Sequence, residues 1–162
     1  MARRVFPLAS DPSYLRGDQY RDSRNIDARI ALHRGFSVNP QGWMAWLFER
    51  LRAAVPAGRR SILELGCGAA TLWRENAARV PAEWSLLLTD FSPGMVLGAA
   101  EGFGVRARYA LADALDLPFH DAAFDVVAAN HMLYHVRDRP RALREIRRVL
   151  VPGGVLFAST VG

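Results

Sequence analysis

Short apolar runs alternate with helical patterns from residue 61 onward, and this alternation constrains the fold more than any other feature of the sequence. The apolar runs are expected to be strands, at residues 62–65, 86–89, 105–111, 124–129 and 155–158. Helices are expected between them, one ending near Val80, one over 93–101, and one from Asp138 that Pro152-Gly153-Gly154 ends. Such alternation predicts a parallel sheet with both faces covered and right-handed crossovers. Ligands of such sheets bind outside the carboxyl ends of the strands, beside the first strand.

The residues before this core follow a different pattern. Residues 1–20 are irregular, and residues 23–34 have the spacing of a helix. Apolar residues then recur every three or four positions in a second helix, at Trp43, Trp46, Leu47, Leu51 and Ala54. We expect the two tryptophans to pack this helix against the sheet. The chain is therefore divided into an N-terminal helical segment, 1–60, and a core, 61–162.

Composition excludes several classes of protein. Cys67 is the single cysteine, so an intrachain disulfide is excluded; with four scattered histidines, a Cys/His zinc cluster is excluded too, and no metal is expected. No apolar run approaches the roughly 20 residues that cross a bilayer, and the N-terminus lacks a signal-peptide core. We therefore expect a soluble, cytoplasmic protein that does not enter a membrane.

The net charge is +5 and every basic residue is arginine. These arginines are spread along the chain, which favours an ordinary charged surface over a patch that binds nucleic acid.

The first expected strand ends in a turn with two glycines. Gly66 and Gly68 permit close approach of a ligand to the backbone, although many nucleotide-binding folds share such a turn. The dinucleotide fingerprint requires a third glycine where Thr71 stands. Glu64, just before the turn, would repel a pyrophosphate but suits a ligand with positive charge and no phosphate. S-adenosylmethionine, with its sulfonium and α-ammonium groups, is such a ligand.

Acids follow the next two expected strands. Asp90 comes about 20 residues after the glycine turn, the position of the ribose-hydroxyl ligand in these folds. Asp113 follows the third strand, where a carboxylate can accept a hydrogen bond from an adenine amino group, between apolar walls from Leu115 and Leu117. Each acid taken alone is equally consistent with a helix cap or a solvated turn. Together with Glu64, they predict an adenosine-containing cationic ligand.

Five segments in a fixed order carry a family resemblance over roughly residues 61–160: LELGCGAA, LLLTDFSPGM, ALADALDLPFHDAAFDVV, NHMLYHV and ALREIRRVLVPGG. In these segments the chain resembles class I S-adenosylmethionine-dependent methyltransferases, especially the bacterial small-molecule group. The resemblance implies an α/β fold with a Rossmann-like, doubly wound, mostly parallel sheet of strand order 3-2-1-4-5. Residues 61–162 would be its S-adenosylmethionine-binding core.

The resemblance also implies which residues hold the cofactor. These are Glu64, Gly66, Cys67 and Gly68 at the methionine end with Asn130 beside them, Asp90, Phe91 and Met95 around the ribose, and Asp113 and Ala114 at the adenine. One departure lies in the turn itself, where Ala70 stands at a position that is often glycine in the family.

A second departure lies at the C-terminus. The family sheet has seven strands, whereas five are expected here, and strands 6 and 7 are missing. With Gly162 as the last residue, the fifth strand would have an exposed apolar edge. We expect either that the sequence is a C-terminally incomplete part of a longer enzyme or that a second copy covers this edge in a homodimer.

Candidates for the chemistry lie after the fourth expected strand and in the N-terminal segment. His131 and His135 are four residues apart and would share a face of a helix, and imidazole titrates in a range that suits a general base. Structural packing is the alternative, and the resemblance favours it for His135. In relatives the N-terminal segment often covers the cofactor as a lid. Its candidate lid or substrate residues, for which a solvated helix face is the alternative, are Tyr14, Tyr20, Arg29 and His33.

The predicted function is transfer of a methyl group from S-adenosylmethionine to a small-molecule acceptor, with S-adenosylhomocysteine as the product. The alternative is a non-catalytic cofactor-binding or assembly module. A nicotinamide oxidoreductase is disfavoured by Thr71 and Glu64. A nucleic-acid methyltransferase is disfavoured because residues 130–133 read NHML, without an Asn/Asp-Pro-Pro-Tyr/Phe motif.

Overall fold

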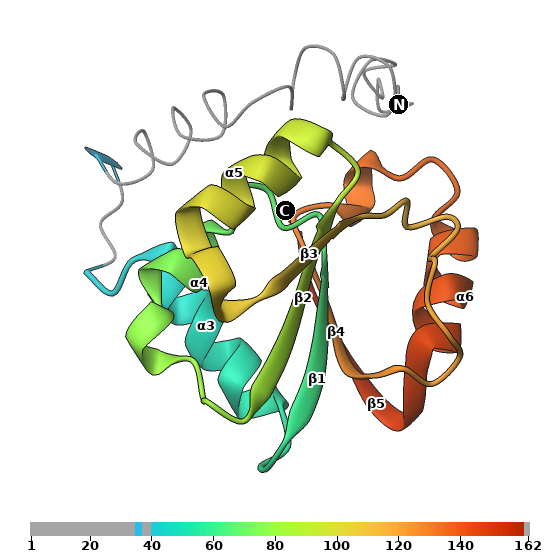
Figure 1. The fold of residues 1–162 in the computed structure, drawn as a ribbon, viewed down its shortest axis with the longest axis horizontal. Coiled ribbons are helices and arrows are strands. Elements are labelled where there is room, and N and C mark those ends of the chain that lie inside the picture. Colours follow the sequence, from blue (N-terminus) through green and yellow to red (C-terminus); the bar gives the residue numbers. More distant parts are fainter. Residues whose placement is uncertain (1–34, 37–39, 161–162) are drawn as a thin grey trace, which may run out of the picture.

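A five-stranded sheet of parallel strands forms the centre of the molecule (Figure 1). The computed structural model describes residues 35–36 and 40–160. The strand order is β3-β2-β1-β4-β5, which confirms the predicted order and the Rossmann-like class. The strands are β1 (Arg60–Leu65), β2 (Trp84–Asp90), β3 (Arg108–Leu111), β4 (Phe124–Asn130) and β5 (Leu150–Ser159).

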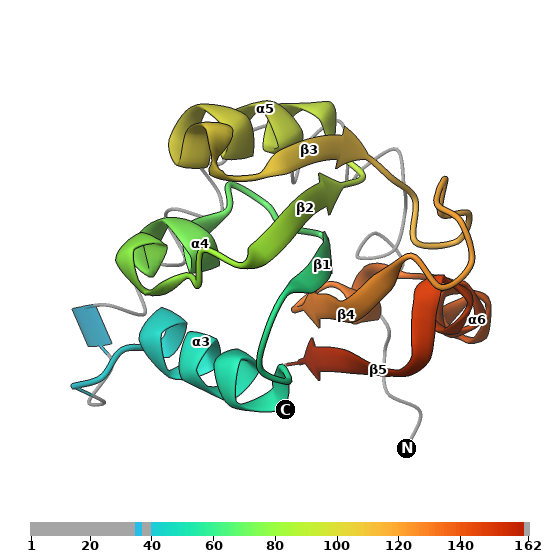
Figure 2. The ribbon, with the colours of Figure 1, turned by 60° about the horizontal axis from the view of Figure 1, so that its bottom comes forward.

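Helices cover both faces of this sheet (Figure 2). Three of them, α3, α4 and α5, pack on one face, and α6 packs on the other. The α-helices are α3 (Trp43–Ala54), α4 (Thr71–Glu75), α5 (Pro93–Phe103) and α6 (Arg139–Val149). Short 3-10 helices are η3 (Ala77–Arg79), η4 (Gly104–Arg106) and η5 (Leu133–His135).

Successive residues of the central strands belong to opposite cores. Ile62 and Val126 pack with α3, α4 and α5, whereas Leu63 and Val127 pack with α6. All four side chains are fully buried. Alternate residues of a strand point to opposite faces, so a sheet covered twice requires apolar residues at every position. This requirement is why the central strands are visible in the sequence as uninterrupted apolar runs.

One expected strand boundary is wrong, and one expected helix is divided in two. β3 begins at Arg108 rather than at Val105, because Gly104 ends α5 with φ +66° and starts η4, which leaves the Val105 side chain in solvent. The helical stretch after the glycine turn reaches Arg79, close to its expected end near Val80, but it consists of α4 and η3. Buried Asn76 leaves helical geometry between them, and its side-chain amide donates to the carbonyl of Leu72 at 2.8 Å. That hydrogen bond satisfies a carbonyl at the end of α4.

The fifth strand is also longer than expected. Pro152-Gly153-Gly154 was predicted to separate the last helix from the strand, but all three residues lie within β5, which starts at Leu150 directly after α6. The pairing of β5 with β4 shifts register between Phe124 and Val126, and Gly153 has φ +78°. Proline and glycine inside a strand mark such irregular pairing. The motif therefore bends β5 rather than preceding it.

The packing of Trp43 also differs from the expectation. The buried face of α3 consists of Leu47, Phe48 and Leu51, whereas Trp43 is 42% exposed. Its ring stacks on Trp46 with the centroids 5.2 Å apart, and only Trp46 packs against the core. Trp43 lies in the first turn of α3, one turn before the buried stripe, so it does not reach the sheet.

Other predictions concern parts that the described residues do not test. Tyr14, Tyr20, Arg29 and His33 lie outside the described residues, and the division of the chain at residue 60 stays a prediction. Within the described ranges β5 pairs only with β4, and the further strands and the homodimer stay predictions. Of the helices in the described part of the chain, none has the length and apolarity needed to cross a membrane.

Candidate active site

The turn after β1 is built from residues in left-handed backbone conformation. Gly66 has φ 68°, Gly68 has φ 55° and Ala70 has φ 55°. Glycine adopts this conformation freely, whereas a residue with a Cβ is disfavoured by roughly 1–2 kcal/mol. The position of Ala70 is therefore one at which the backbone favours glycine. The alanine keeps the turn intact, since its amide donates to the Cys67 carbonyl at 3.0 Å.

Gly66 is required by a close approach as well as by its φ angle. A Cβ added at Gly66 would lie 2.7 Å from the Cβ of Met132, which follows β4. Real Cβ atoms do not come that close, so the glycine lets the loop after β4 pack onto the turn after β1. The ends of these two neighbouring strands thus form one surface.

Glu64 places a carboxyl group beneath this turn. Its side chain is 3% exposed and accepts hydrogen bonds from Trp73 Nε1 at 2.5 Å and from Asn130 Nδ2 at 3.3 Å. Burial raises the pKa of the Glu64 carboxyl from 4.5 to about 7, the negative charge of Asp90 adds to this rise, and the two hydrogen bonds oppose it. A cationic partner stabilises a buried carboxyl whose pKa lies near neutral pH, because the partner favours the charged form that burial disfavours.

Asp90 connects the end of β2 to the same turn. Its Oδ2 accepts from the Gly68 amide at 3.0 Å, and its Oδ1 accepts from the Ser92 amide at 2.9 Å. Burial is the main cause that raises the pKa of Asp90, and the backbone hydrogen bonds and His135 oppose this rise. Each carboxylate oxygen has a second lone pair, so these contacts leave acceptor capacity for two hydroxyl groups. Asp90 therefore both fixes the turn and can serve as a ligand-binding group.

A polar connection runs from β1 through β4 to β5. The Asn130 amide donates to Glu64 Oε1, and its Oδ1 accepts from the Ser159 hydroxyl at 3.2 Å.

The sequence predicts Asn130 and Glu64 as site residues but does not reveal Ser159 and Trp73. Trp73 lies nine residues after Glu64, on α4, where a buried tryptophan reads as an ordinary core residue. No signal in a single sequence pairs it with a carboxylate.

Three residues that the sequence predicts to contact the cofactor differ in how far their side chains are buried. Cys67 points its side chain into the core beside α3 and α4, so only its backbone is available to a ligand. Burial, together with the charges of Glu64 and Asp90, raises the pKa of the Cys67 thiol. Met95 is fully buried in α5, while Phe91 is half-buried directly after β2. Both residues lie close in sequence to Asp90, at the end of β2 and in the first turn of α5, and their role as a wall around the ribose stays a prediction.

His131 and His135 do not share a helix. His131 follows β4 with φ 52°, and η5 begins only at Leu133, so the segment is not helical at His131 and the condition for a shared helix face is not met. The His131 amide instead continues the pairing of β4 with β5 and donates to the Ser159 carbonyl at 3.0 Å. The His131 ring lies 5.2 Å from the Trp43 ring. His135 lies against the Tyr134 ring, with the centroids 4.3 Å apart.

Asp113 and Ala114 begin the loop between β3 and β4. The loop starts beside Asp90, because the Ala112 amide donates to the Asp90 carbonyl at 3.1 Å. The Asp113 carboxylate accepts from the Leu115 amide at 2.9 Å and is otherwise exposed. Ala114 is buried. Leu117 is buried in the core on the α6 side, and Leu115 packs against the same core but is only partly buried, so an adenine wall from these two leucines stays a prediction.

These strand ends bring together a glycine turn, a buried carboxyl and two further carboxylates, the groups from which the sequence predicts a site for a cationic nucleoside. A family model described as "Methyltransferase domain" matches residues 63–158. The chain belongs to this family, and the resemblance to class I S-adenosylmethionine-dependent methyltransferases is thereby confirmed.

Two similar proteins are named as methyltransferases, and one similar solved structure is that of a cyclase. The chain is 35% identical over 119 residues to the ubiquinone/menaquinone biosynthesis C-methyltransferase UbiE of Geotalea daltonii, a match that covers 70% of this chain and 49% of that protein. It is 39% identical over 120 residues to the methyltransferase GfsG of Streptomyces halstedii, covering 71% and 41%. The solved structure of the [4+2]-cyclase SpnF has a TM-score of 0.68 at 29% identity, covering 78% of this chain and 47% of that one. The chain thus spans about half the length of these relatives.

Proposed function

We propose that the chain binds S-adenosylmethionine at the carboxyl ends of β1, β2, β3 and β4 and transfers its methyl group to a small-molecule acceptor. The observation that carries the proposal is the buried Glu64 carboxyl beneath a turn that has no room for a side chain at Gly66. A phosphate-bearing ligand would be repelled there, and a ligand with an ammonium group would be held.

The remaining residues fit the other parts of the same ligand. Asp90 has acceptor capacity for the two ribose hydroxyls, with Phe91 beside it. Asp113 and Ala114 stand at the next strand end, where the adenine would lie. Asn130 steadies the Glu64 carboxyl from β4. The ligand would therefore run across the strand ends, with its methionine end at β1 and β4 and its adenine end at β3.

When bound, S-adenosylmethionine supplies an electrophilic methyl group on a sulfonium leaving group. The work of the chain is then to align the acceptor with the methyl group and to exclude water, and positioning of this kind is worth up to about 7–11 kcal/mol. His131 and His135 are the candidate bases for a hydroxyl or amine acceptor. We favour His131 because it follows Asn130 directly at the end of β4 and its ring lies beside the exposed Trp43.

Relatives guide the choice of acceptors to test. UbiE is named for methylation in quinone biosynthesis, and a malonyl-[acyl-carrier protein] O-methyltransferase of Serratia marcescens is 36% identical over 103 residues, covering 62% of this chain and 38% of that protein. We propose that the acceptor is likewise a small molecule, and an assay panel would contain quinols, carboxylic acids and amines.

Calorimetric titration with S-adenosylmethionine, followed by transfer of a radiolabelled methyl group across this panel, tests the proposal. We expect binding by the wild type, strong loss of binding in Glu64→Gln, and loss of transfer with retained binding in His131→Ala. His120→Ala is the matched control, because His120 is exposed at the opposite end of the sheet, shortly before β4 begins. Binding without transfer to any acceptor would refute the catalytic part, and absence of binding would refute the whole proposal.

A further inference from the structure

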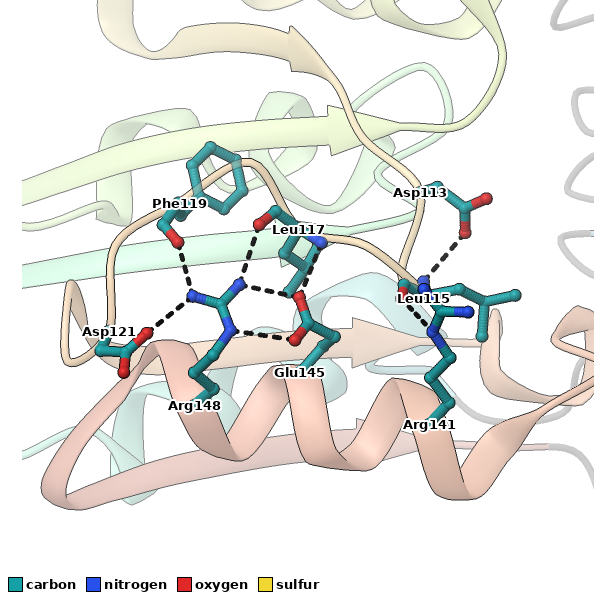
Figure 3. A network of polar contacts seen from close by, with 8 residues as sticks. All are labelled: Asp113, Leu115, Leu117, Phe119, Asp121, Arg141, Glu145 and Arg148. Atoms are coloured by element: carbon teal, nitrogen blue, oxygen red, sulfur yellow. Dashed lines mark hydrogen bonds and ion pairs between the residues drawn. The ribbon is translucent and has the colours of Figure 1, made fainter.

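The guanidinium group of Arg148, on α6, uses all of its hydrogen-bond donors (Figure 3). Its Nε and Nη2 donate to the two oxygens of Glu145 at 2.9 and 2.7 Å. Nη1 donates to the Phe119 carbonyl at 2.7 Å and to Asp121 at 2.9 Å, and Nη2 also donates to the Leu117 carbonyl at 2.9 Å. Arginine has five N–H donors, and five hydrogen bonds are made. Bidentate and charge-assisted contacts of this kind are the strong ones.

Three of these five contacts end on one loop, the connection from β3 to β4, and two of the three are made to its backbone carbonyls. Glu145 adds another, since its Oε2 accepts from the Leu117 amide at 2.8 Å. One turn earlier on α6, Arg141 Nε donates to the Leu115 carbonyl at 2.7 Å. Figure 3 shows the three side chains reaching from one face of the helix to the loop. The Arg148 contact is also the main reason why the pKa of the Glu145 carboxyl falls to about 2, so this carboxyl is charged at neutral pH.

The same loop carries the proposed adenine contacts at its start. Ala112 is held by the Asp90 carbonyl, and Asp113 and Ala114 follow directly. Between Asp113 and Ala122 the loop has no strand neighbour among the described residues, apart from an isolated bridge from Asp113 to Asp116. Side chains from α6 therefore hold this loop in place, as backbone hydrogen bonds between strands hold the sheet. A loop that is fixed in this way can present a carboxylate in one orientation.

We propose that Glu145 and Arg148 are positioning residues that hold the β3–β4 loop so that Asp113 recognises the amino group of adenine. This inference rests on the proposed function, because it needs the adenine to lie at Asp113. It adds a source of specificity that lies on the face of the sheet covered by α6 and touches no ligand. A carboxylate that is held in place accepts from an amino group and repels a keto oxygen, whereas a mobile carboxylate can turn away from either.

The test compares two ligands that differ at the 6-position of the purine. S-adenosylhomocysteine carries the adenine amino group there, whereas S-inosylhomocysteine has a keto oxygen and, with it, a proton on the neighbouring N1. Dissociation constants for both are measured by calorimetry with the wild type, Arg148→Lys and Glu145→Gln. Arg79→Lys is the matched control, because Arg79 makes a comparable 2.8 Å ion pair with Glu49 far from this loop. Deuterium exchange over residues 113–121 reports on the loop itself, with and without ligand.

Loss of a charge-assisted contact predicts that Arg148→Lys and Glu145→Gln lower the preference for S-adenosylhomocysteine by about tenfold and speed exchange in the loop. Arg79→Lys is expected to leave both unchanged. General destabilisation would weaken both ligands alike and leave their ratio intact, so the ratio separates positioning from stability. If Arg148→Lys does not fold, Glu145→Gln decides. An unchanged ratio in a folded variant would overturn this inference alone, while a wild type that binds neither ligand would overturn the proposed function with it.

Discussion

Replacing Glu64 with glutamine separates the contribution of this side chain to stability from its contribution to binding. The pKa of the folded-state carboxyl, about 7, lies above its ordinary value of 4.5, so the folded chain holds this proton more tightly than the unfolded chain. Between these two values the unfolded chain binds fewer protons, and the stability of the wild type therefore falls as the pH rises through this window. Well above pH 7, where the carboxyl is charged in both the folded and the unfolded chain, this loss of stability is complete.

The size of this effect follows from the difference between the two values. The difference of 7 − 4.5, about 2.5 pH units, corresponds to about 3 kcal/mol at roughly 1.36 kcal/mol per unit. Most of it, about 2–3 kcal/mol, lies between pH 5 and pH 8. The neutral amide keeps its oxygen for Trp73. Its new N–H₂ group faces Asn130, which can turn its own amide over, because the Ser159 hydroxyl can accept as well as donate.

Urea unfolding at pH 5 and pH 8, followed by tryptophan fluorescence, measures this contribution. We expect the free energy of unfolding of Glu64→Gln, relative to the wild type, to rise by about 2–3 kcal/mol between the two pH values. Glu101→Gln, the same change at an exposed position of α5, is expected to show no such rise. A difference between Glu64→Gln and the wild type that stays constant with pH would refute the reasoning, since it would mean that the carboxyl does not titrate differently in the folded chain.

The other predictions concern the cofactor. Affinity for S-adenosylmethionine is expected to fall in calorimetry as the pH drops below 7, because protonation of Glu64 removes the partner of the ammonium group; a flat profile would argue against this pairing. Asp90→Ala should weaken binding by roughly 1.5–3 kcal/mol through loss of charge-assisted hydrogen bonds, and unchanged affinity would exclude the ribose assignment. Gly66→Val should abolish binding while the far-ultraviolet dichroism stays native, because its Cβ would meet Met132 at 2.7 Å. The control Gly98→Ala, where a Cβ meets nothing within 4 Å, should bind normally and raise the free energy of unfolding by about 0.5–1 kcal/mol.

The fold could be predicted from the sequence because the sheet is buried on both faces. Continuous apolar runs such as 62–65 and 124–129 have few other uses, and the glycine turn identifies which strand comes first at the ligand-binding edge. Prediction failed where local pattern and tertiary context disagree. Val105 is apolar and was assigned to a strand, yet it lies in solvent because the chain has not yet reached the sheet. His131 and His135 have helical spacing, yet the left-handed residue at His131 prevents a helix.

By itself, the sequence predicted which acids gather at one edge of the sheet, because Glu64, Asp90 and Asp113 lie at or just after the carboxyl ends of β1, β2 and β3, and parallel strands bring these ends together. Only the tertiary structure decided how these groups are held. Trp73 reaches Glu64, Ser159 reaches Asn130, and Arg148 reaches the loop before β4. These contacts join residues whose types are common and whose spacing follows no period. They exist only because helices and strands distant in the chain pack side by side, which is information that a local pattern does not contain.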